Sequence, residues 1–468
     1  MFFRLVVIMV ASKEIDLLHG NLWKKIILFA IPVMLSGLLQ LLFNACDLMV
    51  VGKFSGDDSL AAVGSTGALT SLIVNLFIGF SVGANVAVAK EIGKNDKKRC
   101  HDVVHTSILF SLIVGALLTI FGVLTARYWL IKMDTNADIL DKATTYLTIC
   151  FAGMIFNMLY NFGASIVRAT GETKKPLYYL IIAGITNVVL NLIFVIVFDM
   201  DVAGVAMATV ISQMISSILI IRYLVKTEGM VHFNFRDLKI DKDSLKEIVF
   251  VGLPAGIQSS LFAISNVTIQ TAVNSFNSTA VVAGNSASNN IGGFIYTAMN
   301  AFYQSCITFT SQNFGAKNMK NCEKTLFACL VYVTFVGLLI GGITVLLGRP
   351  LIGLYANGEE AIGYGMTRLT ILALTYFLCG IGDVLVGGLR GLGYSVVPMV
   401  TSIVGICGIR LLWIYTAFEA NHTLQTLYIS YPLSWGITAV VHVICYVFVF
   451  KRAAKSLEFN GEEVLVEA

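Results

Sequence analysis

The alternation of apolar runs and polar breaks along the chain predicts twelve membrane-spanning helices. One span needs about 20 apolar residues, and each run reaches that length between charged or turn residues. Several runs are longer than this requirement, which indicates tilt or extension into the interface. The predicted spans are 24–50, 59–88, 103–126, 143–167, 176–198, 202–225, 247–275, 279–311, 325–348, 362–388, 394–417 and 425–450.

The basic residues give these spans an orientation. Of the 32 Lys and Arg residues, 25 fall on one side of the predicted membrane, six on the other, Arg368 among them, and Arg410 lies inside a span. Cytoplasmic loops retain basic residues. We therefore expect a multi-pass protein of the plasma (inner) membrane with both termini in the cytoplasm, and the sharp split also supports the span count.

The composition narrows the possible functions. The 468 residues are 57% hydrophobic and only 13% charged, against about 25% charged in a soluble domain, so the chain has no room for a soluble catalytic domain. We expect no enzyme activity. A near balance of 32 basic and 28 acidic residues argues against a nucleic-acid partner. No phosphate-binding glycine loop is visible, so we expect no cofactor and a process driven by an ion gradient.

The second half of the chain repeats the first at a shift of 222 residues, in one ungapped register that holds from the first span of each half to the fifth. We call it the repeat register and define it by its matched pairs, which include Pro32 and Pro254, Asn44 and Asn266, Arg168 and Arg390, Gly171 and Gly393, and Pro176 and Pro398. Six spans per repeat give both halves the same orientation, so their pseudo-twofold axis should run along the membrane normal. We predict an all-α protein with two six-helix lobes, which is the usual architecture of a secondary transporter.

The predicted domains follow from this repeat. They are a cytoplasmic segment 1–23, an amino-terminal lobe 24–225, a basic cytoplasmic linker 226–246, a carboxy-terminal lobe 247–450 and a cytoplasmic tail 451–468. The apolar part of Met1–Val10 is too short for a typical signal peptide. We interpret it as an amphipathic segment or an upstream start before an initiator at Met9.

One acidic residue within a span has suitable polar neighbours. Asp47 lies near the outer end of the first span, on the same face as Asn44. Asn187 and Asn191, one turn apart in the fifth span, and Thr209 in the sixth lie at about 10–16 Å depth by helical rise. A carboxylate with amide and hydroxyl oxygens suits a small cation, and a desolvated carboxylate suits a proton. If the ion is sodium, the metal ligands are Asp47, Asn187 and Asn191. The alternative is a solvated Asp47 and amides that only join helices.

Other polar groups within spans form a second candidate set. Asp383 lies in the cytoplasmic half of the tenth span, and Arg410 in the eleventh span is a possible counter-charge for it. Asn157 and Asn161 in the fourth span and Gln258 in the seventh are further polar side chains. With Asn44 and Asp383 they form either a substrate or second polar site, or hydrogen bonds between helices.

A histidine pair resembles part of a zinc motif. His101 and His105, in the sequence HDVVH, have the i, i+4 spacing of metal-binding helices. The sequence contains no evident third ligand and no glutamate base at the usual place. We interpret the pair as the cytoplasmic end of a helix.

Four motifs together resemble the multidrug and toxic compound extrusion (MATE) family. They are AIPVMLSGLLQLLFNACDLMVVGKFSGDDSLAAVG (30–64), VRATGETKKPL (167–177), AGVAMATVIS (203–212) and LRGLGYSVVP (389–398). The resemblance extends from about residue 20 to residue 452. It implies two six-helix lobes with a cavity open to one side. It also implies antiport, the export of small organic, cationic or aromatic compounds in exchange for sodium ions or protons, by a monomer surrounded by membrane lipid.

The resemblance also implies roles for individual residues. Asp47 matches the first-span aspartate of the family, Asn187 and Asn191 its fifth-span polar pair, and Thr209 its sixth-span threonine. One branch has aspartate at the position of Asn191. Another branch uses a seventh-span glutamate, which is absent here because 254–275 contains no acid. The alternative function is a flippase for a lipid or lipid-linked substrate, from the same broad superfamily.

Overall fold

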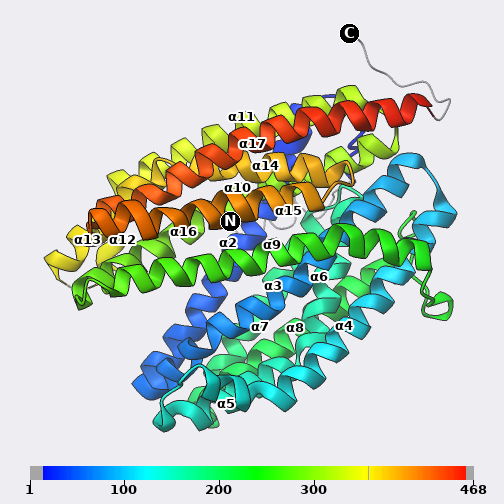
Figure 1. Cartoon of the computed structure of the whole chain (residues 1–468). Helices are drawn as coiled ribbons and strands as arrows, with labels where there is room; N and C mark the ends of the chain where they lie inside the picture. The colour runs from blue at the N-terminus through cyan, green and yellow to red at the C-terminus, as the bar shows by residue number, and fades with distance from the viewer. Residues whose placement is uncertain (1–13, 357, 460–468) are drawn as a thin grey trace. The chain divides into compact units, whose positions relative to one another are not determined.

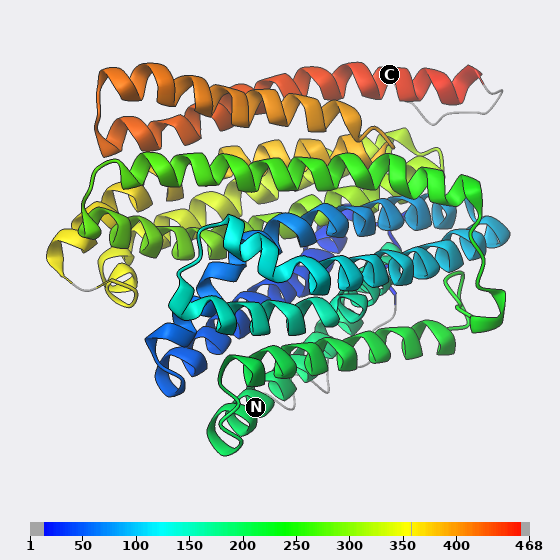
Figure 2. The same cartoon turned by 60° about the horizontal axis from the view of Figure 1, so that its bottom comes forward.

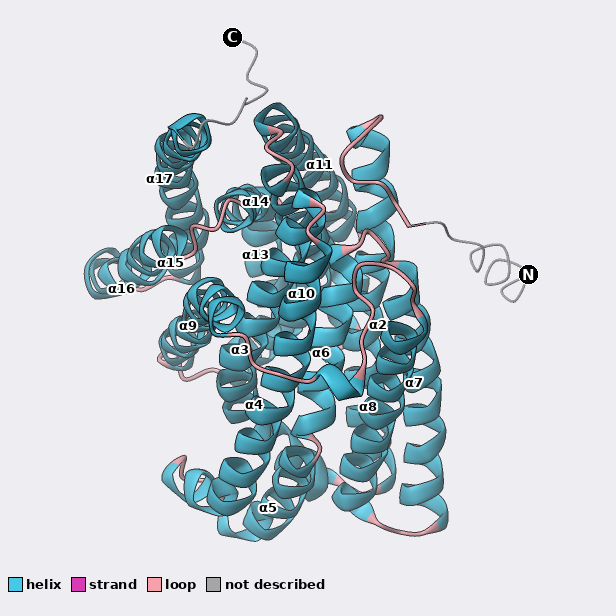
Figure 3. Cartoon of the chain, turned by 90° about the vertical axis from the view of Figure 1, so that its right-hand side faces the viewer, coloured by secondary structure: helices cyan, strands magenta, loops and turns pink. Residues whose placement is uncertain are grey.

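The computed structural model describes residues 14–356 and 358–459, and helices account for nearly all of them (Figures 1 and 3). This described part contains no strand. The predicted all-α class is therefore confirmed. The stretch Met1–Val10 lies outside the described residues, as does the end of the tail after residue 459.

A helix or a bent pair of helices occupies each predicted span. In chain order the elements are α2 (Leu22–Phe54), α3 (Asp57–Lys94), α4 (Lys97–Lys132), α5 (Ala137–Ala152), α6 (Met154–Ala169), α7 (Lys174–Leu192) continued by the π-helix η1 (Ile193–Val197), α8 (Asp201–Lys226), the short η2 (Phe235–Asp237), α9 (Lys242–Asn274), α10 (Thr279–Gly315), α11 (Met319–Leu346), α12 (Gly348–Gly353), α13 (Glu359–Ala373), α14 (Tyr376–Gly391), α15 (Val396–Ser402), the π-helix η3 (Ile403–Gly408), α16 (Ile409–Trp413), the π-helix η4 (Ile414–Phe418) and α17 (Leu424–Phe459).

Helix α10 explains why length and hydropathy alone would undercount the spans. Among the described residues, nine helices are long and apolar enough to cross a membrane, and two bent pairs bring the number to 11. Helix α10 fails that test because it carries polar residues such as Asn285, Ser288 and Asn313. These side chains are buried, and α10 packs against α11, α13 and α14. Because neighbouring helices bury these side chains, α10 can carry polar groups that lipid would not tolerate.

The repeat is visible in the helices themselves. Helices α6 and α14 coincide at both ends in the repeat register, since Met154 pairs with Tyr376 and Ala169 with Gly391. The preceding breaks also coincide: the α5–α6 pair bends by 46° and the α13–α14 pair by 43°. Gly171 and Gly393, which follow matching helices, share a left-handed φ of 90° and 89°, a conformation that favours glycine. The two turns thus have the same backbone conformation, which explains why both contain glycine at this position.

Proline marks the point where two long helices pass from one compact unit to the other. The first unit contains Leu35–Gly256 and the segment ending at Asp16, and the second contains Leu17–Met34 and the chain from Ile257. Each change of unit falls shortly after a proline inside a helix, Pro32 in α2 and Pro254 in α9. A proline inside a helix removes one backbone hydrogen bond and favours a bend.

Many large apolar side chains lie on the outside of the helices. Leu124 is 77% exposed, Leu346 is 85% exposed and Phe448 is 71% exposed. Large apolar side chains exposed in such numbers are unusual on a surface that faces water, whereas lipid tails cover them without cost. The buried positions of the same helices contain small and polar residues, such as Ser107 and Ser111 in α4, as is common where membrane helices meet.

Glycines allow α3 and the first part of α9 to approach closely. A Cβ atom on Gly83 would lie 2.1 Å from the backbone oxygen of Ile248, and one on Gly79 would lie 2.3 Å from the backbone nitrogen of Gly256. Backbone atoms cannot move aside as a flexible side chain can. Only glycine therefore fits at this crossing, as at other close contacts between membrane helices.

We predict that Gly83→Ala destabilises the protein by about 1–3 kcal/mol, the usual cost of overpacking. Thermal unfolding of the purified protein in detergent measures this as a lower apparent melting temperature. Gly64→Ala in the same helix is the matched control, because no atom lies within 4 Å of the added methyl group. Equal melting temperatures for the two variants would contradict the close crossing.

Candidate functional site

Asp47, Asn191 and Thr209 form one hydrogen-bonded cluster inside the first unit. Asp47 comes from α2, Asn191 from α7 and Thr209 from α8. Asn191 Nδ2 donates to Asp47 Oδ1 at 2.5 Å, and Thr209 Oγ1 donates to Asp47 Oδ2 at 3.3 Å. Asn187 completes the cluster, because its amide nitrogen donates to Thr209 Oγ1 and its amide oxygen accepts from Asn191, both at 3.4 Å. The structure brings together all four residues of the predicted coupling site.

The surroundings of Asp47 are neutral. Its side chain is only 8% exposed, and no described residue forms an ion pair with it. Asn191 Oδ1 is buried and has no hydrogen-bond partner. A buried carboxylate without a cationic partner is costly in a membrane. The cluster therefore has both the negative charge and a spare oxygen acceptor that a small cation, or a proton on Asp47, could use.

A cavity of about 260 Å³ opens beside this cluster. Asp47, Asn187 and Thr209 line it together with Asn44, Asn157 and Asn161, which the sequence assigned to a separate polar set. Asn161 Nδ2 also donates to Asn157 Oδ1 at 3.1 Å, one turn away in α6. Three members of the second candidate set thus share one cavity with the coupling candidates.

The other two members of that set lie in the second unit. Gln258 Oε1 accepts a hydrogen bond from Arg390 Nη2 at 2.8 Å. Asp383 is hydrogen-bonded to Tyr296 and lies within the field of Arg390. Neither residue lines the Asp47 cavity.

Arg410 has aromatic neighbours and is not the counter-charge that its sequence position suggested for Asp383. Its guanidinium carbon lies 4.1 Å from the ring centroid of Tyr431 and 5.7 Å from that of Trp435. Arg368, which the sequence placed among the outward-facing charges, is only 3% exposed and lies within α13. Sequence position alone could not reveal this burial, because the residue lies close to the end of a predicted span.

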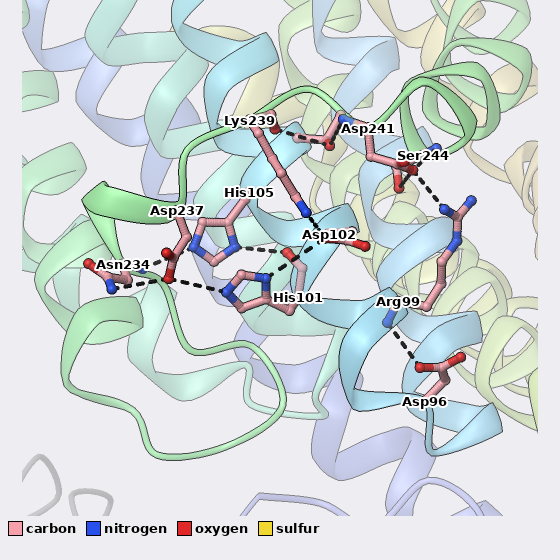
Figure 4. A network of polar contacts seen from close by, with 11 residues as sticks. Asp96, Arg99, His101, Asp102, His105, Asn234, Asp237, Lys239, Asp241 and Ser244 are labelled. Carbon is pink, nitrogen blue, oxygen red and sulfur yellow. Dashed lines mark hydrogen bonds and ion pairs between the residues drawn. The ribbon is translucent and has the colours of Figure 1, made fainter.

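The histidine pair has a third ligand-type neighbour that the sequence did not reveal. Asp237 Oδ2 lies 3.6 Å from His101 Nε2, and the rings of His101 and His105 stack with centroids 3.9 Å apart. One ligand atom from each of the three residues lies within 4.8 Å of the others. However, His105 Nε2 already accepts a hydrogen bond from the backbone of Asn234 at 3.1 Å. These contacts connect α4 to the segment that follows α8 (Figure 4).

The chain between α8 and α9, drawn in green in Figure 2, is fastened to α4 by further polar contacts. Lys239 forms an ion pair with Asp102 at 2.8 Å, and Arg99 forms one with Asp241 at 2.7 Å. Asp241 Oδ2 also accepts hydrogen bonds from the amide and hydroxyl of Ser244, at 2.8 and 2.7 Å. These hydrogen bonds, with the charge of Arg99, hold the pKa of Asp241 below its ordinary value. Asp241 thus caps α9 and anchors the linker.

Comparison with known proteins gives consistent matches over nearly the whole chain. A family model described as MatE matches residues 32–193 and again residues 254–416, which agrees with the internal repeat. The "Probable multidrug resistance protein YoeA" of Bacillus subtilis is 25% identical over 447 residues, which cover 92% of this chain and 95% of that protein. The "Multidrug export protein MepA" of Staphylococcus saprophyticus is 21% identical over 435 residues, or 90% and 96% of the two chains.

Solved structures share the fold. A transporter of the MOP superfamily from Pyrococcus furiosus, described as having a binding pocket of reverse polarity, is similar with a TM-score of 0.89 and 23% identity, over 94% of this chain and 99% of that chain. An outward-facing multidrug resistance MATE family transporter is similar with a TM-score of 0.88 and 23% identity, over 95% and 99%. These likenesses confirm the twelve-helix fold with two lobes.

We predict that Asp241→Ala lowers the stability of the protein by about 1 kcal/mol, the typical cost of losing a helix cap. Thermal unfolding at neutral pH measures the loss, with Asp243→Ala, an exposed neighbour in the first turn of α9, as control. A lowered pKa means that the native carboxylate holds its proton less tightly than the unfolded one. Its contribution to the free energy of unfolding is therefore present above about pH 4 and disappears as the pH falls further. A variant as stable as the control would contradict the anchoring role.

Proposed function

Because the chain belongs to the MATE family of membrane transporters, we propose that it exports small organic compounds in exchange for sodium ions or protons. The names of its relatives, which include multidrug resistance and multidrug export proteins, support multidrug efflux as the activity. The observation that carries the proposal is Asp47, a buried carboxylate with only amide and hydroxyl partners.

The polar groups around Asp47 suit either coupling ion. A sodium ion prefers oxygen ligands, as other hard cations do, and Asp47, Asn187 and Asn191 offer a carboxylate and two amide oxygens. A proton on Asp47 would turn one carboxylate oxygen into a donor, which the hydroxyl of Thr209, 3.3 Å from Asp47 Oδ2, could accept. In both cases the ion removes the uncompensated charge. Ion binding therefore changes the electrostatic free energy of the first unit.

The transport cycle follows from this difference in charge. We infer that the loaded and the empty Asp47 cluster favour different conformations of the protein. A cation that arrives from outside would then shift the population toward the conformation that releases the exported compound. Such coupling requires only that the cation binds the two conformations with different affinity, and it must act in both directions. No cofactor is needed, since the ion gradient supplies the free energy.

The location and orientation are part of the same proposal. We place the protein in the plasma membrane with both termini in the cytoplasm, because basic residues gather on one side of the twelve helices. The linker between α8 and α9, which polar contacts attach to α4, then lies in the cytoplasm. We also propose that the protein works as a monomer, because one chain contains the complete Asp47 cluster.

We predict that Asp47→Asn lowers gradient-driven efflux at least about tenfold, within the range of typical coupling energies of about 1–3 kcal/mol. Efflux of a fluorescent organic cation from proteoliposomes, with sodium and proton gradients imposed separately, measures the effect and identifies the ion. Asp58→Asn is the matched control, because Asp58 is an exposed carboxylate in the first turn of α3.

Full efflux in Asp47→Asn, or an equal loss in Asp58→Asn, would contradict the proposed role. The Asn substitution keeps the size of the side chain and one acceptor oxygen, and it replaces the other oxygen with an amide donor, which the hydroxyl of Thr209 can accept. Membrane insertion and thermal stability should therefore remain close to those of the wild type. This separates a loss of coupling from a loss of folding.

A further inference from the structure

Two arginines are buried in the second unit without an acidic partner. Arg368 is 3% exposed and Arg410 is 5% exposed. Arg368 donates to Ser288 Oγ at 3.2 Å and Asn289 Oδ1 at 3.0 Å, and Arg410 donates to Ser434 Oγ at 3.2 Å. No described residue forms an ion pair with either arginine, and the buried Nε of Arg368 has no hydrogen-bond partner. The two positive charges are therefore uncompensated within the described chain.

Asp383, an acid within a span of the same unit, does not neutralise them. Asp383 in α14 lies in the field of a different arginine, Arg390, and is hydrogen-bonded to Tyr296. Isolated charges inside a membrane protein cost several kcal/mol, and those that are retained usually mark the path of an ion or substrate. A pair of arginines without a counter-ion among the described residues favours a counter-ion from outside this part of the chain.

Aromatic rings surround both guanidinium groups. The ring of Tyr431 lies 5.9 Å from the guanidinium carbon of Arg368 and 4.1 Å from that of Arg410. The ring of Tyr428 lies 6.0 Å from the guanidinium carbon of Arg368. The ring of Trp435 lies 5.7 Å from that of Arg410. Cation–π contacts of this kind partly replace the lost hydration. They also form an aromatic wall next to the charges.

The repeat places this arginine cluster where the first unit has its Asp47 cluster. The repeat register relates Arg368 to Tyr146. Extended to the sixth span, where α8 begins at Asp201 and α17 at Leu424, it also relates Tyr431 to Thr209. Tyr146 packs against a hydrophobic cluster that includes Val50 and Val51, which follow Asp47 in α2. The same register relates two further lining residues of the Asp47 cavity, Ser212 and Gln213, to Ser434 and Trp435, which contact Arg410.

The residue equivalent to Asp47 confirms the correspondence in space. It is Ile269, which packs in one hydrophobic cluster with Tyr431 and Trp435. The second unit thus has an apolar side chain where the first unit has Asp47. Its arginines contact Tyr431, which belongs to the same cluster as this apolar side chain. The two units have opposite charge at equivalent places.

The helix around Arg410 is interrupted by π-helical segments. Arg410 lies in α16, between the π-helices η3 and η4. The first unit has a counterpart of η4, namely η1, but its helix α7 remains regular where η3 would lie. Short π-helical segments often occur at functional sites. The irregular backbone therefore marks the same position as the unpaired charge.

We propose that the Arg368–Arg410 cluster binds the anionic group of an aromatic organic anion that the protein exports, while the first unit binds the coupling cation. The planar guanidinium groups can hold a carboxylate or sulfonate through paired hydrogen bonds, and the rings of Tyr428, Tyr431 and Trp435 contact its aromatic part. Because both arginines are buried, the anion reaches them when the surrounding helices open, as alternating access requires. The export role of the cluster rests on the proposed function; its anion binding does not.

Two dyes with the same xanthene framework test this proposal. Fluorescein carries negative charge at mildly alkaline pH, and rhodamine 6G carries positive charge. We expect the purified protein in lipid nanodiscs to bind fluorescein, and Arg368→Gln and Arg410→Gln each to weaken that binding at least about tenfold, a factor worth about 1.4 kcal/mol. Fluorescence anisotropy measures both dyes. Binding of rhodamine 6G should stay unchanged or become tighter, because the substitutions remove a like charge.

Two controls separate anion binding from folding. Arg349→Gln removes an exposed arginine of the same unit, whose ion-pair partner is Glu359, and should leave the binding of both dyes unchanged. Arg410→Lys keeps the positive charge but loses the planar group, so we expect it to bind fluorescein more tightly than Arg410→Gln. This rescue would not occur if the arginine only filled space.

The proposal is overturned if the wild type does not bind fluorescein, or if Arg368→Gln and Arg410→Gln bind it as tightly as Arg349→Gln does. Its failure is distinguishable from failure of the antiport proposal, because dye binding needs no gradient. Asp47→Asn should still bind fluorescein. If fluorescein binding is absent while rhodamine 6G is exported by an ion gradient, the antiport proposal stands and the anion site is rejected.

Discussion

Uncompensated charge inside the membrane-spanning helices is the constraint on which the rest of this structure depends. Water would solvate Asp47, Arg368 and Arg410 at little cost, but the interior of a helical membrane protein does not. Among the described residues, the hydrogen-bond and ring partners of these side chains are neutral amides, hydroxyls and aromatic rings. Each unit therefore keeps a buried charge that an ion or ligand from outside the chain could neutralise. A transporter can use this property, because binding and release then change the stability of a conformation.

The two units show how one backbone can present two kinds of chemistry. Their helix ends, bends and left-handed turns coincide in the repeat register, and both long first helices contain a proline at the same place. The side chains that differ lie around the polar clusters, where Asp47 corresponds to Ile269 and Thr209 to Tyr431. The fold is thus common to both halves, and the function depends on the side chains placed on it.

Much of this could be predicted from the sequence, and the remainder depended on tertiary contacts. Long apolar runs reveal spans because lipid requires them, and the grouping of Asp47 with Asn191 and Thr209 followed from their depth. The polar helix α10 is the span that hydropathy marks least clearly, although the run 279–311 already predicts it from the sequence. Arg368 was assigned to the outer surface because sequence position does not show which face of a helix meets another. Asp237 meets His101 through the folding of the linker, which no spacing encodes.

The most direct test of the central claim is to run the exchange backwards. Proteoliposomes with a gradient of exported dye and no ion gradient would be examined for movement of radioactive sodium and for a change of internal pH. Since coupling is reciprocal, the account predicts that one of the two ions moves against the dye in the wild type and that this movement ceases in Asp47→Asn. Dye movement without movement of either ion, or ion movement that persists in Asp47→Asn, would contradict it.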